Sequence, residues 1–521
     1  MTQLTAPPQR FNFAQYLFDL NHHRAAKTAY IDDAGTLSYG ALEEQSRRFA
    51  TALLDLGIHR EERVFLAMLD CREWPVAFLG CLYAGAVPIC ANTLLPAEEY
   101  AFMLDHSRSR AVITSATLLD KIQKAAAKTR SGTLPLVVVG ATQASPSITP
   151  FADFLKREPK AQPDDTYADD IAFWMYSSGS TGRPKAVVHT HGNLYWTNET
   201  YGKNVLKLHE DDLVFSAAKF FFAYGFGNAL TFPLCVGATI IAMAERPTPA
   251  AVFKRLIEHK VTIYYGVPTL FASMLAAPDK PTKQQLALRL CTSAGEPLPE
   301  QIGVHFKQQF GADILDGIGS TEMLHIFLCN RAEDIHYGTT GTPVPGYEIS
   351  LRDEHGQPVP DGEIGDLYIK GPSAPLMYWR DRKRSQAAFL GEWTKAGDKY
   401  LRDAQGYYTY CGRSDDMLKV SGQYVSPAEV ESTLICHDSV LEAAVIGVNN
   451  EQGLMRTKAF VVLKDGVAAS PALEQELHSF VKSKLAPHKA PKQIAFIHEL
   501  PKTATGKIQR FRLREQEKHG A

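Results

Sequence analysis

Short apolar runs alternate with amphipathic stretches along most of the chain. The short runs are rich in valine, isoleucine and leucine and are bounded by polar turns, which predicts buried strands. The stretches between them, such as residues 39–56 and 250–259, place apolar residues at helical spacing. This alternation predicts an α/β protein with largely parallel sheets. The short runs begin at Arg63, Ala111, Leu136, Ile171 and Thr239.

The longest apolar run covers residues 76–91. It is shorter than the roughly 20 residues that span a bilayer, and Gly80, Gly85 and Pro88 interrupt it. A buried helix over 76–86 that leads into a buried strand over 87–91 explains it better. The N-terminal residues are polar and offer no apolar signal core. We therefore expect a cytoplasmic protein that does not enter a membrane.

The residue pattern changes near Gly412, where a strand-like run gives way to a polar turn. We place a domain boundary at Asp415, with a large N-terminal domain over 1–414 and a small α+β domain over 415–521. Residues 140–165 are rich in proline, serine and threonine and are expected to form a surface connection. The elements expected in the small domain are helices over 427–437 and 471–485 and strands over 442–448 and 458–464.

Composition narrows the class of protein. A chain of 521 residues exceeds one ordinary core, in keeping with two domains. The formal net charge of -2 gives no overall attraction to nucleic acid or anionic membranes. The 8 cysteines form no CxxC pair, and we interpret them as buried small apolar side chains of a reducing compartment rather than disulfides or metal ligands. They are Cys71, Cys81, Cys90, Cys235, Cys291, Cys329, Cys411 and Cys436.

The strongest chemical signal is the segment Tyr176-Ser-Ser-Gly-Ser-Thr-Gly-Arg-Pro-Lys185. Its glycines permit backbone conformations in which amide N–H groups converge on an anion, and its hydroxyl and cationic groups add donors. A polyphosphate fits such a loop, although the loop lacks the Walker A pattern. A flexible glycine-serine surface loop is the alternative. The candidate phosphate-binding residues are Ser177, Ser178, Gly179, Ser180, Thr181, Gly182 and Lys185.

This loop resembles the signature of the adenylate-forming superfamily, which includes acyl-CoA synthetases, adenylation domains of peptide synthetases and luciferases. Five further motifs of the superfamily follow in order and at similar spacing. Within it, the chain most resembles bacterial benzoate–CoA ligases, above all around residues 219–230 and 320–328. The five motifs are Ser293-Ala-Gly-Glu-Pro297, Gly317-Ile-Gly-Ser-Thr-Glu322, Trp393-Thr-Lys-Ala-Gly-Asp398, Gly412-Arg-Ser-Asp-Asp416 and Pro501-Lys-Thr-Ala-Thr-Gly-Lys507.

The resemblance implies a large N-terminal α/β domain of layered sheets and helices and a small, mobile C-terminal α+β domain. It also implies an acid–thiol ligase that uses ATP, Mg²⁺ and coenzyme A. An aromatic acid, most simply benzoate, would attack the α-phosphate of ATP to give acyl-AMP and pyrophosphate. Coenzyme A would then displace AMP.

The same resemblance assigns the groups of the first half-reaction. Lys507 would bridge the acid carboxylate and the α-phosphate and so offset their repulsion. Glu322 would hold Mg²⁺, for which a carboxylate is a suitable hard ligand. Thr321 would contact a phosphate oxygen through its hydroxyl.

For the second half-reaction, the resemblance implies a rotation of the small domain about Asp415. After this rotation residues 419–425 would face the active site. Lys419 would then approach the carboxylate, and Gly422 would allow the pantetheine arm to pass closely.

The nucleoside part of ATP would lie against two other motifs. Asp398 would accept hydrogen bonds from both ribose hydroxyls, and Arg413 would approach the same ribose. The walls of the adenine slot would come mainly from the backbone of Gly295, Glu296, Pro297, Asp316, Gly317 and Ile318.

The acid-recognition segment of the family corresponds to residues 220–228, Phe-Phe-Phe-Ala-Tyr-Gly-Phe-Gly-Asn. It has no carboxylate to pair an α-amino group, and a buried unpaired ammonium is costly, so amino acids are poor candidates. Aromatic and small residues suit a flat apolar acid, and no side chain obviously partners a ring hydroxyl. Gly319 would leave space for a planar ring. By resemblance the pocket consists of Ala223, Tyr224, Val267, Gly319, Leu324, His325 and Ile326.

One position departs from the family pattern. Ala186 follows the loop lysine where relatives usually have glycine. If this position requires a positive φ, alanine would strain the turn by roughly 1 kcal/mol.

Other functions remain open from the sequence. A stand-alone aryl adenylation enzyme would load a carrier protein instead of coenzyme A. A ligase that prefers 4-hydroxybenzoate or 2-aminobenzoate would use the same motifs. A nucleotide-binding regulator is disfavoured because Lys507, Glu322 and Asp398 are intact, and a luciferase-like oxygenase is more remote.

The expected partners are small molecules rather than nucleic acid or membrane. Lys507 lies in a basic segment with a glycine, so a lysine acetyltransferase is a candidate partner. Acetylation would remove the positive charge and stop adenylation. A homodimer is also kept open.

Overall fold

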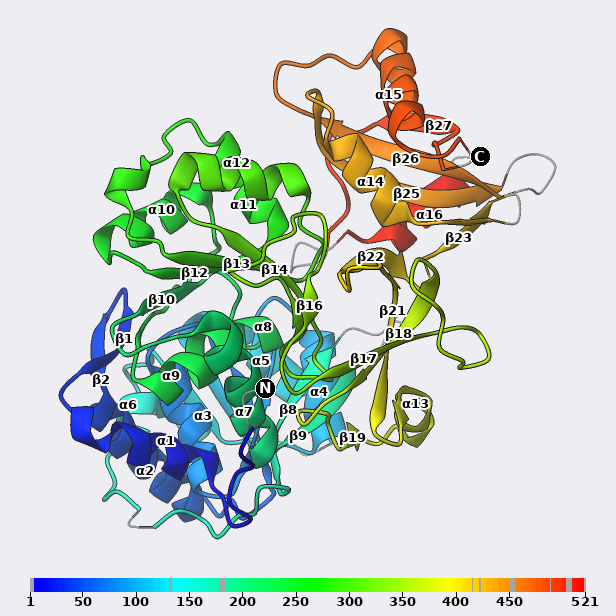
Figure 1. Cartoon of the computed structure of the whole chain (residues 1–521). Coiled ribbons are helices and arrows are strands. Elements are labelled where there is room, and N and C mark those ends of the chain that lie inside the picture. The colour runs from blue at the N-terminus through cyan, green and yellow to red at the C-terminus, as the bar shows by residue number, and fades with distance from the viewer. Residues whose placement is uncertain are drawn as a thin grey trace.

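The computed structural model describes residues 4–130, 134–160, 162–177, 184–414, 416–420, 423–449, 455–487, 489–502 and 508–519. Three sheets and most of the described helices belong to a large N-terminal part, and two smaller sheets with three helices belong to a C-terminal part, drawn from orange to red in Figure 1. The α/β class expected from the sequence is confirmed. Within the described ranges, no helix is long and apolar enough to cross a membrane.

The first sheet has nine strands in the described part of the chain. Its centre is parallel, from β1 through β11, β10, β12 and β13 to β14, and antiparallel strands lie at both edges. In order across the sheet, the strands are β16 (Thr342–Pro343), β15 (Ile326–Cys329), β14 (Ile314–Gly319), β13 (Leu290–Ser293), β12 (Ile263–Gly266), β10 (Leu213–Ser216), β11 (Thr239–Ile241), β1 (Thr28–Asp32) and β2 (Gly35–Ser38).

The second sheet has eight described strands and is parallel except where β9 pairs with β8 and β19. The phosphate-loop motif connects β8 to β9, so the loop expected after a strand does follow one. In order, the strands are β19 (Met377–Tyr378), β9 (Lys185–Thr190), β8 (Ile171–Ser177), β4 (Val87–Cys90), β3 (Arg63–Ala67), β5 (Ala111–Ser115), β6 (Leu136–Val139) and β7 (Ile148–Pro150).

The two sheets and the helices form layers because successive strand residues face opposite sides. Val64 packs into the large core between the sheets, whereas Phe65 faces a second core beneath α4 and α5. Tyr264 and Tyr265 likewise face opposite sides of the first sheet, Tyr264 toward α10, α11 and α12. The helices are α1 (Phe13–Asn21), α2 (Tyr39–Asp55), α3 (Glu73–Tyr83), α4 (Ala97–Ser107), α5 (Leu119–Ala126), α7 (His191–Thr197), α9 (Phe232–Val236), α10 (Pro249–Glu258), α11 (Pro268–Ala276) and α12 (Glu300–Phe310).

Local capping explains where several helices begin. Ser38 accepts a hydrogen bond from the Ala41 amide at the start of α2, and Thr248 caps α10 in the same way immediately before a proline. Such hydroxyl caps satisfy amide groups that the first turn leaves unpaired, and proline is well tolerated directly after them.

A third, antiparallel sheet connects the two parts of the molecule. Its strand β22 contacts α14 of the C-terminal part. The described strands of this sheet are β17 (Glu348–Arg352), β18 (Ile364–Lys370), β21 (Trp393–Arg402), β20 (Phe389–Leu390) and β22 (Tyr408–Arg413), and α13 (Arg382–Ala388) lies between β19 and β20 in sequence.

The C-terminal part has its own core around β25 and β26. Glu431 accepts two hydrogen bonds from the Arg510 guanidinium and one from the Val445 amide, which joins α14, α16 and β25. The elements are β23 (Leu418–Val420), β24 (Gln423–Val425), α14 (Pro427–Ile435), β25 (Val440–Asn449), β26 (Met455–Leu463), α15 (Pro471–Lys484), β27 (Gln493–Phe496) and α16 (Arg510–His519).

Most expected elements are confirmed, with two corrections. Residues 140–165 are more than a surface connection, because β7 and the short helix α6 (Phe151–Phe154) lie there and bury Phe151 and Phe154. Cys436 is exposed at the end of α14 rather than buried. All eight cysteines are free, and Cys71 and Cys235 are only partly buried.

Candidate active site

Two of the motifs meet at one edge of the first sheet because their strands are parallel neighbours. Ser293 of β13 lies opposite Asp316 of β14, so the segments that follow both strands leave from the same edge. This is the carboxyl edge, where open α/β sheets bind ligands. The structure therefore places the segment after Ser293, which carries residues 295–297, beside the end of β14, the strand that leads to Thr321 and Glu322.

Asp316 offers an unused polar group at this edge. The residue is buried, and its Oδ1 atom has no hydrogen-bond partner among the described residues. Burial raises the pKa of this carboxyl well above its usual range, although the amides of Leu298 and Gly317 act in the opposite direction. A buried polar atom without a partner costs about 1–3 kcal/mol. A ligand with adjacent donor and acceptor groups, such as the amino edge of adenine, would satisfy it.

Glu322 forms a compact triangle with Lys185 and Tyr378. Its Oε1 lies 2.8 Å from Lys185 Nζ and accepts a 2.9 Å hydrogen bond from the Tyr378 hydroxyl. Lys185 Nζ also donates to the Tyr378 oxygen at 2.9 Å. Burial raises the pKa of Glu322, but the Lys185 ammonium and these hydrogen bonds outweigh it and leave the pKa below its usual value. Glu322 is therefore held as a carboxylate.

The chemistry of this carboxylate suits Mg²⁺. Hard oxygen ligands are the ones that Mg²⁺ prefers, and the ion commonly takes only one or two carboxylates while phosphates and water complete its shell. Across the described ranges, no group of three or more histidine, cysteine or acidic side chains could form a complete metal cage. Glu322 thus fits a metal that arrives with a nucleotide.

His189 fixes the backbone beside Glu322. Its Nε2 donates to the Thr321 carbonyl oxygen at 2.8 Å, and its Nδ1 lies 3.1 Å from Asn193 Oδ1. The imidazole is fully buried, and burial lowers its pKa. This contact holds the strand β9 against the Thr321 turn.

The expected ribose pair is adjacent in the third sheet. Asp398 of β21 lies opposite Arg413 of β22, and an ion pair of 3.1 Å joins Arg413 Nη1 to Asp398 Oδ1. Asp398 is buried while the arginine is about half exposed. The pair can therefore present a fixed carboxylate to a bound hydroxyl.

Of the residues expected to form the acid pocket, Tyr224 and Gly319 lie against His325. Its Nε2 donates to the carbonyl oxygen of Tyr224 at 3.2 Å, and the rings of Tyr224, Tyr201 and Phe232 lie 5.7, 5.0 and 4.5 Å from the imidazole. Burial lowers the pKa of His325 to about 3, so the imidazole is neutral at physiological pH. The surroundings are aromatic and uncharged. Ala223 and Tyr224 begin the short helix α8 (Ala223–Phe226), which continues as a π-helical segment over Gly227–Thr231.

The backbone of His325 also requires glycine at position 319. A Cβ atom there would come within 2.7 Å of the backbone of His325, so the close approach of two chain segments demands glycine. Leu324 adopts a positive φ of 62° in the same turn and is buried, as is Ile326. Val267 is half-buried and packs beside α10, α11 and α12. The turn is shaped by backbone packing before any ring is bound.

The strain expected at Ala186 is absent. Ala186 is buried in β9 opposite Tyr176, and it is not among the residues with positive φ. An extended strand accepts alanine without cost, so this departure from the family pattern has no consequence for the backbone.

Several expected residues lie outside the described ranges. The side chain of Lys419 is also outside them, although its backbone belongs to β23. The residues concerned are Ser178, Gly179, Ser180, Thr181, Gly182, Asp415, Gly422 and Lys507.

Comparison with protein families agrees with this arrangement. The family model of the AMP-binding enzyme matches residues 19–379, and that of the AMP-binding enzyme C-terminal domain matches residues 429–507. The chain belongs to the AMP-binding enzyme family.

Individual members of this family are similar over nearly the whole chain. The benzoate–CoA ligase of Thauera aromatica is 52% identical over 511 residues, which cover 97% of this chain and 96% of that protein. The crystal structure of a benzoate CoA ligase from Burkholderia xenovorans LB400 has 59% identity and a TM-score of 0.91, covering 97% of this chain and 100% of that one. The anthranilate CoA ligase AuaEII in complex with anthranoyl-AMP has 39% identity and a TM-score of 0.94, covering 99% and 98%.

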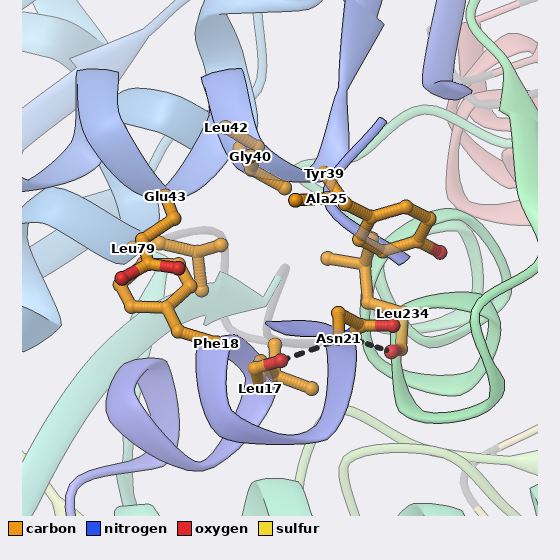
Figure 2. A pocket seen from close by; sticks show the side chains of 10 residues that line it. All are labelled: Leu17, Phe18, Asn21, Ala25, Tyr39, Gly40, Leu42, Glu43, Leu79 and Leu234. Atoms are coloured by element: carbon orange, nitrogen blue, oxygen red, sulfur yellow. Dashed lines mark hydrogen bonds between the residues drawn. The ribbon is translucent and has the colours of Figure 1, made fainter. Parts of the chain in front are cut away.

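One small cavity of this AMP-binding enzyme lies away from the motifs. Figure 2 shows it between α1, α2, α3 and α9, where Asn21 donates hydrogen bonds to the carbonyl oxygens of Leu17 and Leu234. Its volume of about 10 Å³ has room for about one water molecule. None of the expected site residues lines it, so we assign it no part in the reaction.

Three residues of the site escaped the sequence analysis. Tyr378 and His189 lie outside the six motifs. Thr292 also lies outside them and immediately precedes the motif that begins at Ser293. Thr292 Oγ1 lies 2.6 Å from the Tyr224 hydroxyl. Each acts through a partner far away in sequence, and the spacing of residues along the chain carries no signal for such contacts.

Proposed function

We propose that the protein joins an aromatic carboxylic acid, most simply benzoate, to coenzyme A with cleavage of ATP to AMP and pyrophosphate. The observation that carries this proposal is the neutral, aromatic surroundings of His325, which include Tyr224. His325 belongs to the turn that follows Glu322 in the chain. An apolar ring would lie in this enclosure while its carboxylate faces the nucleotide. The similarity to benzoate–CoA ligases of Thauera aromatica and Burkholderia xenovorans supports the same substrate.

In the first half-reaction, a carboxylate oxygen of the acid attacks the α-phosphorus and pyrophosphate leaves. Mg²⁺ bound at Glu322 would supply positive charge to the phosphates. Lys185 and Thr321 stand beside Glu322 and would contact phosphate oxygens, while Asp316 and Asp398 orient the base and the ribose. Lys507 would offset the charge between the two reacting anions.

In the second half-reaction, the thiolate of coenzyme A attacks the acyl carbon and AMP leaves. We place the boundary of the mobile domain at Asp415, between β22 and β23, and assign Lys419 and Gly422 to the thioester step. The loop at this boundary connects β22, which contacts α14, to the C-terminal core. A rotation there would turn one face of the small domain away from the active site and bring another face toward it.

A substituted benzoate is the second candidate substrate class. His325 Nδ1 and the Tyr265 hydroxyl are buried without hydrogen-bond partners among the described residues. The rings of Tyr224 and Tyr265 lie 6.4 Å apart, so both groups belong to the surroundings of the enclosure. An amino or hydroxyl substituent that reached either group would satisfy it, which favours 2-aminobenzoate or 4-hydroxybenzoate over aliphatic acids.

Pyrophosphate release with ATP and Mg²⁺, measured with and without coenzyme A, tests the function. The acids would be benzoate, 4-hydroxybenzoate, 2-aminobenzoate, cinnamate, acetate, hexanoate and phenylalanine. We expect turnover that depends on coenzyme A and is highest with benzoate. Turnover with aliphatic or amino acids only would overturn the pocket assignment, and transfer to a carrier protein but not to coenzyme A would favour an aryl adenylation enzyme.

Location and regulation complete the proposal. We place the enzyme in the cytoplasm and include a homodimer as a state to be measured by light scattering. Acetylation of Lys507 by a lysine acetyltransferase would remove its charge and stop adenylation. Mass spectrometry of acetylated, inactive protein in which Lys507 is unmodified would reject this form of regulation.

A further inference from the structure

Tyr378 connects the two charged groups of the candidate metal site. Its hydroxyl donates to Glu322 Oε1 and accepts from Lys185 Nζ, and its ring centroid lies 4.5 Å from the same ammonium. The side chain is buried. A tyrosine hydroxyl is both a donor and an acceptor, so it can donate to the carboxylate while it accepts from the ammonium.

The surrounding structure fixes the position of this hydroxyl. Tyr378 belongs to β19, which pairs with β9 close to Lys185, and its amide donates to Ser385 at 3.0 Å. The ring of the next residue, Trp379, lies 4.4 Å from the ring of Trp174 of β8 in a tilted arrangement, and its Nε1 donates to the His106 carbonyl oxygen. A group held on both sides in this way cannot easily follow a moving partner.

The contacts direct Lys185 and Tyr378 to the same oxygen of Glu322. Both engage Oε1, which leaves Oε2 as the oxygen for a cation. Without the phenol hydroxyl, the flexible Lys185 ammonium could pair with either oxygen. A cation would then compete directly with the lysine.

We propose that Tyr378 is a positioning residue that holds Lys185 on one oxygen of Glu322 and keeps the other available for the metal of the metal–nucleotide complex. This inference rests on the proposed role of Glu322 as the metal ligand. It assigns a function to β19, an edge strand outside the six motifs.

Isothermal titration calorimetry of the full-length Tyr378→Phe protein, which measures nucleotide affinity, tests the inference. One titration uses Mg·ATP and the other uses ATP with EDTA. The phenylalanine keeps the ring over Lys185 and removes only the hydroxyl. We expect Mg·ATP to bind about 10-fold more weakly, as for the loss of a hydrogen bond to a charged group, and metal-free ATP to bind within about 2-fold of the wild type.

Tyr407→Phe is the matched control, because its exposed hydroxyl donates to the Asp334 carboxylate at 2.6 Å. It should change neither titration. If Tyr378→Phe leaves both affinities unchanged, or weakens both equally, the positioning role is wrong.

Glu322→Gln separates this inference from the proposed function. If Glu322→Gln leaves Mg·ATP binding intact, the metal assignment itself fails. If Glu322→Gln weakens binding and Tyr378→Phe does not, only the inference about Tyr378 fails. If Tyr378 acts through Glu322, the double variant should bind Mg·ATP no more weakly than Glu322→Gln alone.

Discussion

The hydroxyl of Tyr224 lies 2.6 Å from the hydroxyl of Thr292, which ties the short helix α8 to β13. Tyr224 belongs to the proposed acid-recognition segment, whereas Thr292 lies in the strand β13, which leads to the proposed adenine slot. The hydrogen bond therefore couples the position of the proposed acid pocket to the proposed nucleotide side of the site.

Replacing Thr292 with valine should weaken this coupling. Valine has nearly the same shape but leaves the buried Tyr224 hydroxyl without a partner, which costs about 1–3 kcal/mol. We expect a lower free energy of unfolding and a higher KM for the aromatic acid, measured by denaturant unfolding and steady-state kinetics. Thr292→Ser keeps the hydroxyl and is the control. Equal behaviour of the two variants would show that the hydrogen bond is unimportant.

Gly227→Ala should disturb the acid pocket from the opposite side. A Cβ there would come within 2.4 Å of His325 Cδ2 and 2.8 Å of Phe232, so the imidazole would have to move. Such overpacking costs about 1–3 kcal/mol. We expect kcat/KM for benzoate to fall about 10-fold, while calorimetric binding of Mg·ATP stays unchanged. Loss of nucleotide binding as well would indicate a general folding defect.

Asp70 should make the stability of the N-terminal part depend on pH. Burial raises the pKa of its carboxyl to about 6, against the influence of Lys219 and the Phe220 amide. Because the folded pKa lies above the unfolded value, the folded state binds the proton more tightly. This stabilisation is complete below pH 4 and is lost as the pH rises through about 6, a change of about 3 kcal/mol.

The measurement is denaturant unfolding of the wild type and of Asp70→Asn from pH 4 to 7.5. The asparagine cannot ionise, so the difference in unfolding free energy between the two proteins should shift in favour of the variant as the pH rises. Asp120→Asn removes an exposed carboxylate and should follow the wild type. A constant difference between the wild type and Asp70→Asn would contradict the raised pKa.

Lys507→Ala should separate the two half-reactions. The lysine is assigned to charge compensation during adenylation only, so acyl-AMP formation should become at least about 100-fold slower, in the range of other lost transition-state contacts. Thioester formation from supplied benzoyl-AMP and coenzyme A should remain close to wild type. Equal loss of both steps in rapid-quench assays would reject the assigned role.

Much of the fold could be predicted because local patterns suffice to indicate it. The runs at Arg63 and Ala111 are strands, residues 39–56 contain α2, and the apolar run at 76–91 covers most of α3 and all of β4. The prediction that failed for residues 140–165, a surface connection, shows what local patterns miss. Phe151 and Phe154 lie in a segment rich in polar residues, and their burial depends on α2 and β6, which no local window includes.

The sequence by itself determined which residue types are available for the proposed chemistry: a carboxylate for a metal, a loop for an anion, a carboxylate for a ribose and an acid segment without charge. The loop follows from its own residues, because glycines let backbone amide groups converge on an anion. The roles of the other three follow from the ordered motifs that resemble the adenylate-forming superfamily. Only the tertiary structure decided which groups touch. The pairing of β19 with β9 places Tyr378 between Lys185 and Glu322, and the approach of His325 requires glycine at 319 and 227. These contacts join residues that lie far apart in the chain, so packing rather than pattern specifies them.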